Sequence, residues 1–307
     1  MRVIPAIDFH AIDWRYFVDA IEAGHRLSRA QLDDSFLGPS EATLLSRAAY
    51  IPELGYLVKS ATVLSDNARR GLPTVQTIAA YFDSQTGTPV ALLDGASLTN
   101  IKTAADSVCG ARALANPEPK VLFSIGAGTV ARHSIAAYLA IFPSIRSVRV
   151  FSRRQATAMD CLACLESTDV DFEIVQSIER GCPGADVICS STMATEPVLR
   201  GQWVEPGTHV DLVGAFKANM READDELMAR ASVFVDSRDT TIAHIGELIA
   251  PIQSGALKPE DIQADLYELV GQPYSRSLSE VTVFKNGGGA HLDLMVAKAM
   301  IDQAVSA

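Results

Sequence analysis

The chain has 307 residues and a formal net charge of −11. This length exceeds what one hydrophobic core usually supports, so we expect two domains. The negative charge argues against nucleic-acid binding as a main role, because a polyanion repels the phosphate backbone. No stretch reaches the roughly 18–20 consecutive apolar residues of a membrane span, and Asp8 and Asp13 do not fit a secretory signal. Five irregularly spaced cysteines suit a reducing compartment. We therefore expect a cytoplasmic protein that binds neither nucleic acid nor membrane.

The first part of the chain, residues 1–115, predicts a mixed α+β domain. Asp8 is expected to cap a helix that runs to His25. A β-rich stretch follows, in which the last two segments flank turn residues and predict a hairpin. The strand-like segments are residues 56–64, 73–83 and 88–95. A helix over 97–115 should then link this domain to the next, because it ends before Asn116-Pro117.

From Lys120 onward, strand-like apolar runs alternate with helix-length segments. The six strand candidates are residues 121–126, 147–152, 171–177, 185–191, 209–214 and 232–236. Such runs are typical of a parallel sheet covered on both faces. The fold class is therefore predicted as α/β, with a Rossmann-type doubly wound domain over residues 116–287. The closing helix, 291–305, is expected to pack back onto the N-terminal domain, so that residues 288–307 complete it.

The segment Gly126-Ala127-Gly128-Thr129-Val130-Ala131 follows a predicted strand and opens a predicted helix over 129–142. It fits the G-x-G-x-x-G/A pattern of dinucleotide-binding turns. Gly126 permits the tight turn, Gly128 lets the backbone approach a pyrophosphate, and Ala131 allows close packing of helix and strand. The helix N-terminus offers free N–H groups to the phosphates. We assign residues 126–130 to cofactor binding; the alternative is a structural glycine turn.

The end of the second strand should meet the adenosine ribose, where NAD sites usually have a carboxylate. Here the sequence is Ser152-Arg153-Arg154. Two guanidinium groups can bind a 2′-phosphate, which favours NADPH over NADH. The alternative is that both arginines are solvated surface residues.

Several segments together resemble the ornithine cyclodeaminase/μ-crystallin family, nearly end to end and in order. They are VKSATVL around Lys59, RGLPTVQ (70–76), GTPVALLDG leading into SLTNIKTAA, GAGTVA, EPVLRGQWVEPGTHVDLVGA (196–215) and VTVFKNGGGAHLDLMVAKA. Members include ornithine cyclodeaminases, an alanine dehydrogenase, ketimine reductases and Δ1-pyrroline-2-carboxylate reductases. The resemblance implies a homodimer, with residues 1–115 and 288–307 binding the substrate and forming the dimer.

The resemblance also implies roles for individual residues. Lys59 matches the lysine that holds the substrate carboxylate, and Lys102 falls where most members have an arginine that grips the same group. We expect these two lysines to be the catalytic residues, although an ammonium lacks the bidentate fork of a guanidinium. Thr74 matches a threonine beside the nicotinamide. Asn286 and Gly287 match the loop that reaches the substrate.

The most informative departure from the family is Phe216. The ornithine cyclodeaminases have an aspartate there, which handles a proton or water during ammonia loss. A phenyl ring cannot act as a general acid or base, so cyclisation of ornithine is disfavoured and this wall of the site becomes apolar. We assign Phe216 to the cofactor site, together with Thr192 and Val213, which lie at the ends of predicted strands.

The resulting hypothesis is NAD(P)H-dependent reduction of Δ1-pyrroline-2-carboxylate and Δ1-piperideine-2-carboxylate, two small imino acids, to L-proline and L-pipecolate. The alternatives are an alanine-type amino-acid dehydrogenase, an ornithine cyclodeaminase with a substitute base, and a non-catalytic NADPH-binding protein.

Three other residues have two interpretations each, and one cysteine pair could suggest a metal site. Arg47 either lines the substrate site or forms an ion pair. His291 is either a site residue or a contact at a helix start, and Asp293 is a helix N-terminal charge or a base. The pair Cys161 and Cys164 is expected to pack in a core rather than bind a metal, because no second ligand pair follows.

Overall fold

The computed structural model describes residues 1–39, 41–165, 169–272 and 274–306. The chain forms two compact units. Unit 1 contains Met1–Lys102 and Gly289–Ala307, and unit 2 contains Thr103–Gly288. The border lies inside helix α2 (Gly95–Leu114), and not at its end, where the predicted boundary after residue 115 would place it.

Unit 1 is built on a six-stranded mixed sheet in the order β1-β6-β5-β4-β3-β2. Its strands are β1 (Arg2–Ile4), β2 (Gln31–Leu37), β3 (Ala42–Ile51), β4 (Gly55–Leu64), β5 (Val75–Phe82) and β6 (Pro89–Asp94). Only β1 pairs in parallel, with β6, and the other neighbours are antiparallel. The predicted strand at 56–64 and the predicted hairpin are confirmed as β4 and as the β5–β6 pair.

The hairpin formed by β2 and β3 was not predicted from the sequence. Every residue of β2 is exposed, and β3 buries only Ala49 and Ile51. Without one buried face, the alternation of apolar and polar residues that identifies a strand is absent. The hairpin is instead held by a long antiparallel register against β4, from Ala42↔Leu64 to Ile51↔Gly55.

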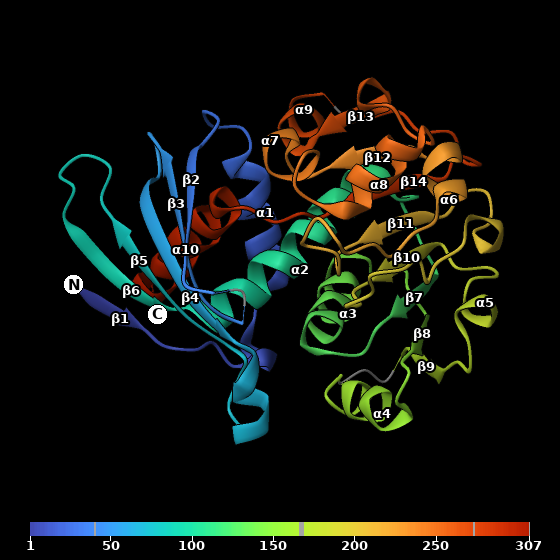
Figure 1. Ribbon diagram of the computed structural model, residues 1–307, viewed down its shortest axis with the longest axis horizontal. Helices are drawn as coiled ribbons and strands as arrows, with labels where there is room; N and C mark the ends of the chain where they lie inside the picture. Colours follow the sequence, from blue (N-terminus) through green and yellow to red (C-terminus); the bar gives the residue numbers. More distant parts are fainter. Residues whose placement is uncertain (40, 166–168, 273, 307) are drawn as a thin grey trace. The chain divides into compact units, whose positions relative to one another are not determined.

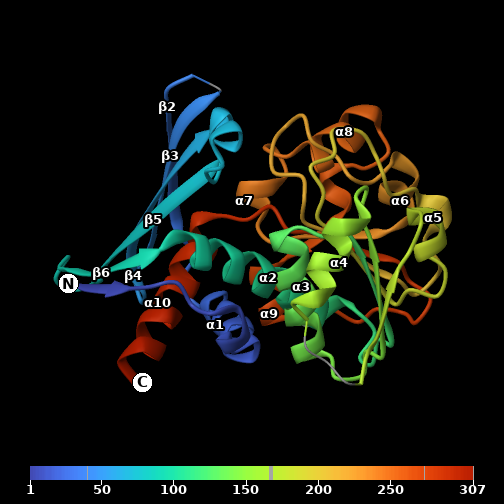
Figure 2. The same cartoon turned by 90° about the horizontal axis from the view of Figure 1, so that it is seen from below.

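Helices α1 (Trp14–Gly24) and α10 (Ala290–Ser306) belong to the same unit and pack against each other (Figure 1). α10 also contacts β3 and β4, as predicted for the closing helix. The predicted start of the first helix is wrong. Asp8 caps only the 3-10 turn Phe9–Ala11, while α1 begins at Trp14 because the Asp13 carboxylate accepts from the Tyr16 N–H. Figure 2 shows α10 and α1 beside the sheet from a second direction.

Unit 2 contains an eight-stranded parallel sheet in the order β13-β12-β14-β11-β10-β7-β8-β9. Its strands are β7 (Val121–Ile125), β8 (Ser147–Phe151), β9 (Asp171–Ile174), β10 (Val187–Ser190), β11 (His209–Leu212), β12 (Ser232–Val235), β13 (Ile262–Asp265) and β14 (Thr282–Lys285). All six predicted strands are present, with shorter ends. β13 and β14 were not predicted, and β14 lies between β11 and β12. This is the predicted Rossmann-type sheet, whose chain order reverses between β7 and β10.

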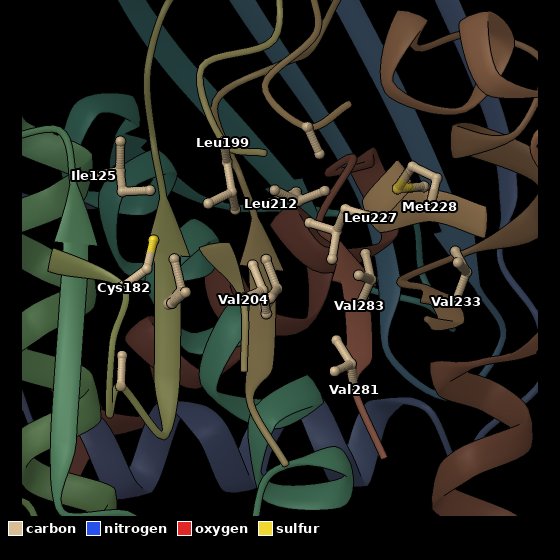
Figure 3. Packing of buried hydrophobic residues seen from close by; sticks show 14 of the residues in the cluster. Ile125, Cys182, Leu199, Val204, Leu212, Leu227, Met228, Val233, Val281 and Val283 are labelled. Carbon is tan, nitrogen blue, oxygen red and sulfur yellow. The ribbon is translucent and has the colours of Figure 1, made fainter. Parts of the chain in front are cut away.

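Helices and short 3-10 turns connect these strands. The helices are α3 (Thr129–Ile141), α4 (Gln155–Ala163), α5 (Ile178–Gly181), α6 (Asp225–Arg230), α7 (Arg238–Thr241), α8 (Gly246–Ser254) and α9 (Leu266–Gly271). The remaining 3-10 turns are Ser65–Arg70 in unit 1, and Gly201–Trp203 and Pro259–Asp261 in unit 2. Figure 3 shows part of the apolar core of unit 2, in which Ile125, Leu212 and Val283 from the sheet pack with Leu199 and Leu227. Cys161 is buried and Cys164 is partly buried; both are free thiols. Within the described ranges, no helix is long and apolar enough to cross a bilayer.

Candidate functional site: an anion site in unit 1 and a dinucleotide turn in unit 2

The turn between β7 and α3 has the geometry that a dinucleotide requires. Gly126 has a φ of 113°, and a Cβ there would lie 2.8 Å from the carbonyl oxygen of Ser191, so only glycine fits. Gly128 is the N-cap of α3, makes no side-chain cap hydrogen bond, and has open space where a Cβ would be. Ala127 is buried, whereas Thr129 is exposed at the start of the helix. The free N–H groups of this helix end, Val130 among them, can therefore receive a phosphate.

The end of β8 carries the predicted ribose-binding residues. Ser152 follows the strand, and its hydroxyl accepts from the Arg154 N–H at 3.3 Å. Arg153 and Arg154 are exposed, and neither forms a salt bridge with the residues that the structure describes. Two exposed cations beside the glycine turn fit a 2′-phosphate, because each guanidinium can donate two parallel hydrogen bonds.

A buried carboxylate that the sequence did not reveal organises the ends of β10 and β11. Glu222 accepts from the Ser190 hydroxyl, from both the N–H and the hydroxyl of Thr192, each at 2.7 Å, and from the Gly214 N–H at 2.6 Å. Val213 is buried between these contacts, and its N–H donates to the Ser190 carbonyl. The predicted residues Thr192 and Val213 are thus fixed at the carboxyl edge of the sheet, where ligands of this fold bind.

Phe216 lies just beyond that edge and is 51% exposed. The Lys217 ammonium lies 5.4 Å from the centre of its ring, a cation–π distance. The neighbouring Ala215 is fully buried, so the backbone is anchored while the aromatic ring projects outward. An exposed ring at this position offers an apolar surface and no titratable group.

In unit 1, two lysines form the centre of a positively charged site. Lys59 on β4 and Asp293 on α10 form a buried salt bridge of 2.7 Å, and the Lys59 ammonium also donates to the Thr99 hydroxyl at 3.3 Å. Burial lowers the pKa of Lys59 below the ordinary lysine value; Asp293 opposes this shift and Lys102 adds to it. Asp293 is the acidic residue in the first turn of α10, as one of its two interpretations predicted, and it also forms the ion pair with Lys59.

Lys102 on α2 is also buried, with 5% of its surface exposed. Its ammonium has no hydrogen-bond or salt-bridge partner within the described part of the chain. Because Lys59 is already neutralised by Asp293, the pair of lysines carries one positive charge in excess. A buried charge without a counter-charge is costly, so this arrangement is suited to a small anion.

Three other predicted residues lie in unit 1. Arg47 on β3 is directly paired with Lys59 across the sheet, and its guanidinium donates twice to Asp34, at 3.0 and 2.8 Å. His291 is fully buried against the His25 ring, and burial holds its pKa well below the usual range, so it is neutral. Thr74 precedes β5, and its carbonyl accepts from the Leu64 N–H.

The loop after β14 is held inside unit 2. The Asn286 amide nitrogen donates to the Thr103 carbonyl and to the Ser107 hydroxyl, both at 2.9 Å, so it grips α2 immediately after Lys102. The Gly287 N–H donates to Asp236 at 3.0 Å, and a Cβ on Gly287 would lie 2.6 Å from the Thr241 hydroxyl. These two residues therefore support the loop, and direct contact with a substrate stays a prediction.

Ser107 also connects Asn286 to a buried carboxylate. Asp211, within β11, accepts from the Ser107 and Tyr138 hydroxyls at 3.1 Å and from the Cys189 thiol at 3.4 Å. The sequence held a signal for this residue, because HVDLVG places a charge inside an otherwise apolar strand. Lys285 in VTVFK is a second such signal, and its ammonium donates to the Leu212 carbonyl at 2.6 Å.

The two units together define a protein of the dinucleotide-dependent oxidoreductase class, with a glycine turn on a parallel sheet and a buried lysine pair on a mixed sheet and its adjoining helix. Comparison with known families identifies which one. The chain belongs to the ornithine cyclodeaminase/mu-crystallin family, whose model matches residues 48–307.

Individual relatives agree with this assignment. A Delta(1)-pyrroline-2-carboxylate reductase of Paracoccus denitrificans is 51% identical over 93% of this chain and 91% of its own. The mouse ketimine reductase mu-crystallin is 34% identical over 80% of this chain and 74% of its own. The structure of a Thermococcus litoralis Delta(1)-pyrroline-2-carboxylate reductase in complex with NADH and L-proline superposes with a TM-score of 0.92 at 25% identity, covering 100% of this chain and 98% of that one. An archaeal alanine dehydrogenase dimer with bound NAD superposes with a TM-score of 0.90 at 27% identity, covering 99% and 96%.

The Asp211 network generates a prediction about pH. Burial raises the pKa of Asp211 to about 6, although the Ser107, Cys189 and Tyr138 hydrogen bonds oppose that shift. The stability that the protonated carboxyl contributes is therefore complete below about pH 4 and is lost as the pH rises through 6, by roughly 2–3 kcal/mol. Asp211→Asn should flatten the fall in unfolding free energy between about pH 4 and pH 6, measured by urea unfolding.

The matched control is Asp171→Asn, at an exposed position on the edge strand β9. Its pH profile should follow that of the wild type, including the background from Glu247, whose pKa burial and Glu222 raise to about 7. An Asp211→Asn profile as steep as the wild-type one would contradict the prediction.

Proposed function

We propose that this protein is an NAD(P)H-dependent reductase of cyclic ketimines, which converts Δ1-pyrroline-2-carboxylate and Δ1-piperideine-2-carboxylate to L-proline and L-pipecolate. The observation that carries this proposal is the buried, unpaired Lys102 ammonium beside the Lys59–Asp293 salt bridge. It supports a site for one small carboxylate. The Paracoccus denitrificans reductase at 51% identity and the mammalian ketimine reductases support the choice of imine substrates.

In this proposal unit 2 binds the cofactor and unit 1 binds the substrate carboxylate. In unit 2 the turn Gly126–Gly128, with Arg153 and Arg154, would hold the dinucleotide, which when bound supplies a hydride. In unit 1 Lys102 and Lys59 bind the carboxylate and thereby orient the imine carbon for attack. Catalysis of this kind depends mainly on position, because an iminium carbon accepts hydride readily.

The alternatives are less well supported by the residues present. Ornithine cyclisation needs a group that moves a proton or water during ammonia loss, and Phe216 supplies none. An alanine-type dehydrogenase would use the same carboxylate anchor but must also take up free ammonia. A non-catalytic NADPH-binding protein would have no need for a buried cation that lacks a partner.

The proposed carboxylate site depends on the charge of Lys102. Lys102→Met removes the charge but keeps much of the side-chain volume, so kcat/KM for Δ1-pyrroline-2-carboxylate should fall by about 10²-fold, the value of one buried charge-assisted hydrogen bond. The affinity for NADPH should not change, because its proposed ligands lie in unit 2. Oxidation of NADPH followed by its absorbance measures both effects.

Two controls accompany that assay. Lys120→Met, on an exposed lysine of unit 2, should retain wild-type activity. Pyruvate with ammonia, and ornithine alone, should be turned over far more slowly than the two cyclic imines. Wild-type protein that binds NADPH but reduces neither imine would reject the proposed function.

We further propose a preference for NADPH, which rests on Arg153 and Arg154 and on the lack of a carboxylate at the end of β8. Replacing both arginines by alanine should raise KM for NADPH by about 10- to 100-fold and change KM for NADH little, because only NADPH has the 2′-phosphate. The same double change should leave KM for the imine unaltered. If both cofactors were weakened equally, the arginines would not select the phosphate.

A homodimer is also part of this proposal. The face of the unit 1 sheet opposite Lys59 exposes Tyr56, Val58 and Ile78, and contiguous apolar residues on a surface mark interaction sites. Ile78→Asp should lower the mass in solution from that of two chains toward 32.8 kDa, measured by light scattering during gel filtration. Leu278→Asp, at an exposed leucine of unit 2, is the control and should leave the mass unchanged. A wild-type mass of one chain at all concentrations would reject the dimer.

The cytoplasm is the proposed location. The five cysteines are free thiols and four of them are buried, which suits a reducing compartment.

A further inference from the structure

We propose that Asp293 recognises the protonated ring nitrogen of the substrate, and so selects cyclic imino acids that carry an N–H donor next to their carboxylate. This inference rests on the function proposed above and assigns that site a second recognition element. The first element, the lysine pair, selects any small carboxylate. The second element would distinguish an iminium acid from a carboxylate of the same shape whose ring has no N–H donor.

The two carboxylate oxygens of Asp293 have different surroundings. Oδ1 lies 2.7 Å from the Lys59 ammonium. Oδ2 is buried and has no hydrogen-bond partner within the residues that the structure describes. A buried carboxylate oxygen without a donor is rare in folded proteins, and one beside a proposed binding site indicates that a ligand supplies the donor.

The charges around Asp293 lead to the same conclusion. Lys59 and Asp293 neutralise each other, which leaves the charge of Lys102 for the substrate carboxylate. Arg47 is paired with Asp34, and His291 is neutral because burial keeps its pKa low. The carboxylate of a simple acid would neutralise the positive charge of Lys102. An iminium acid adds one more positive charge, and Asp293, which is bonded to Lys59, is a carboxylate that can face it.

The geometry of a cyclic imino acid matches this set of groups. Its carboxylate is attached to the carbon next to the nitrogen, so the anion and the N–H donor lie on one edge of the molecule. Lys59 is near both of these groups, since it is paired with Asp293 and interacts electrostatically with Lys102. One edge of the substrate can therefore meet Lys102 through oxygen and Asp293 through the N–H.

In this role Asp293 accepts a hydrogen bond from the iminium N–H and does not take the proton. When hydride adds to the carbon, the electron pair of the C=N bond becomes the nitrogen lone pair, and the nitrogen keeps its proton. The amine then gains a second proton from water. A carboxylate next to the nitrogen favours the protonated imine in the complex, so the reactive form persists to higher pH.

The test compares two planar acids that differ at one ring atom. Pyrrole-2-carboxylate presents an N–H, whereas furan-2-carboxylate presents an oxygen that would face the Asp293 carboxylate. The wild type, saturated with NADPH, should bind the pyrrole at least about tenfold more tightly, measured by calorimetry. Asp293→Asn should abolish the preference, because the amide oxygen turns to Lys59 and its NH2 group meets the ligand N–H.

A second readout is the pH profile of kcat/KM, whose decline should begin at a lower pH in Asp293→Asn than in the wild type. The matched control is Asp302→Asn, which removes another carboxylate from α10, one that is paired with Lys298 on the exposed face. This control should keep both the ligand preference and the pH profile. The thermal midpoints of all three proteins show whether each is folded.

The outcomes separate the inference from the function on which it rests. Equal affinity of the wild type for the two acids, with imine reduction intact, would overturn the inference alone, and this comparison needs no variant. A folded Asp293→Asn protein that still prefers the pyrrole would overturn it as well. Failure of the wild type both to bind these acids and to reduce imines would overturn the proposed function together with the inference.

Discussion

Unit 1 depends on one constraint, a buried ammonium group that has no ion-pair partner among the residues that the structure describes. Lys102 lies in a helix and is almost inaccessible, and the ammonium of Lys59, also a cation, is close enough to interact with it electrostatically. Proteins accept such a charge only where something compensates for it, because desolvation of an ion costs several kcal/mol. Here the salt bridge between Lys59 and Asp293 removes one of the two positive charges. The other has no ion-pair partner among the described residues, and in the proposed function it binds the substrate carboxylate.

Unit 2 also uses buried charged side chains, but here they are carboxylates that hold loops in place. Its ligand is proposed to bind at the ends of parallel strands, where the backbone N–H and C=O groups no longer have hydrogen-bond partners in the sheet. Glu222 compensates for this by accepting four hydrogen bonds from Ser190, Thr192 and Gly214, which ties together the loops that follow β10 and β11. Asp236 does the same for the loop after β14 through the Gly287 and Gly288 N–H groups. The edge that would receive the dinucleotide is therefore held in place by buried carboxylates that never need to touch it.

The resemblance implies an aspartate in ornithine cyclodeaminases where this chain has Phe216, and this difference suggests how one family scaffold can host different reactions. Where a carboxylate can move protons, ammonia can be expelled; where a phenyl ring stands, only the hydride step remains available. The lysine pair is useful in either case, because every substrate of this kind carries a carboxylate. Function is set by the groups added to a shared anchor, and the fold alone does not specify it.

Much of this protein could be read from its sequence, where the signal was local. The glycine turn at 126–128, the arginines that follow β8 and the apolar strands of unit 2 are patterns over a few consecutive residues, and they were found. The β2–β3 hairpin and β14 escaped because one lacks a buried face and the other is a short strand inserted between β11 and β12.

Pairings between distant residues could be seen only in the tertiary structure. Lys59 and Asp293 are 234 positions apart, and Asn286 and Thr103 are 183 apart, so no local pattern connects them. The sequence by itself determined which chemical groups and which strand and helix types the chain contains. Only the tertiary structure decided which charges neutralise one another and which are left over, because that depends on distances and burial that exist only after folding.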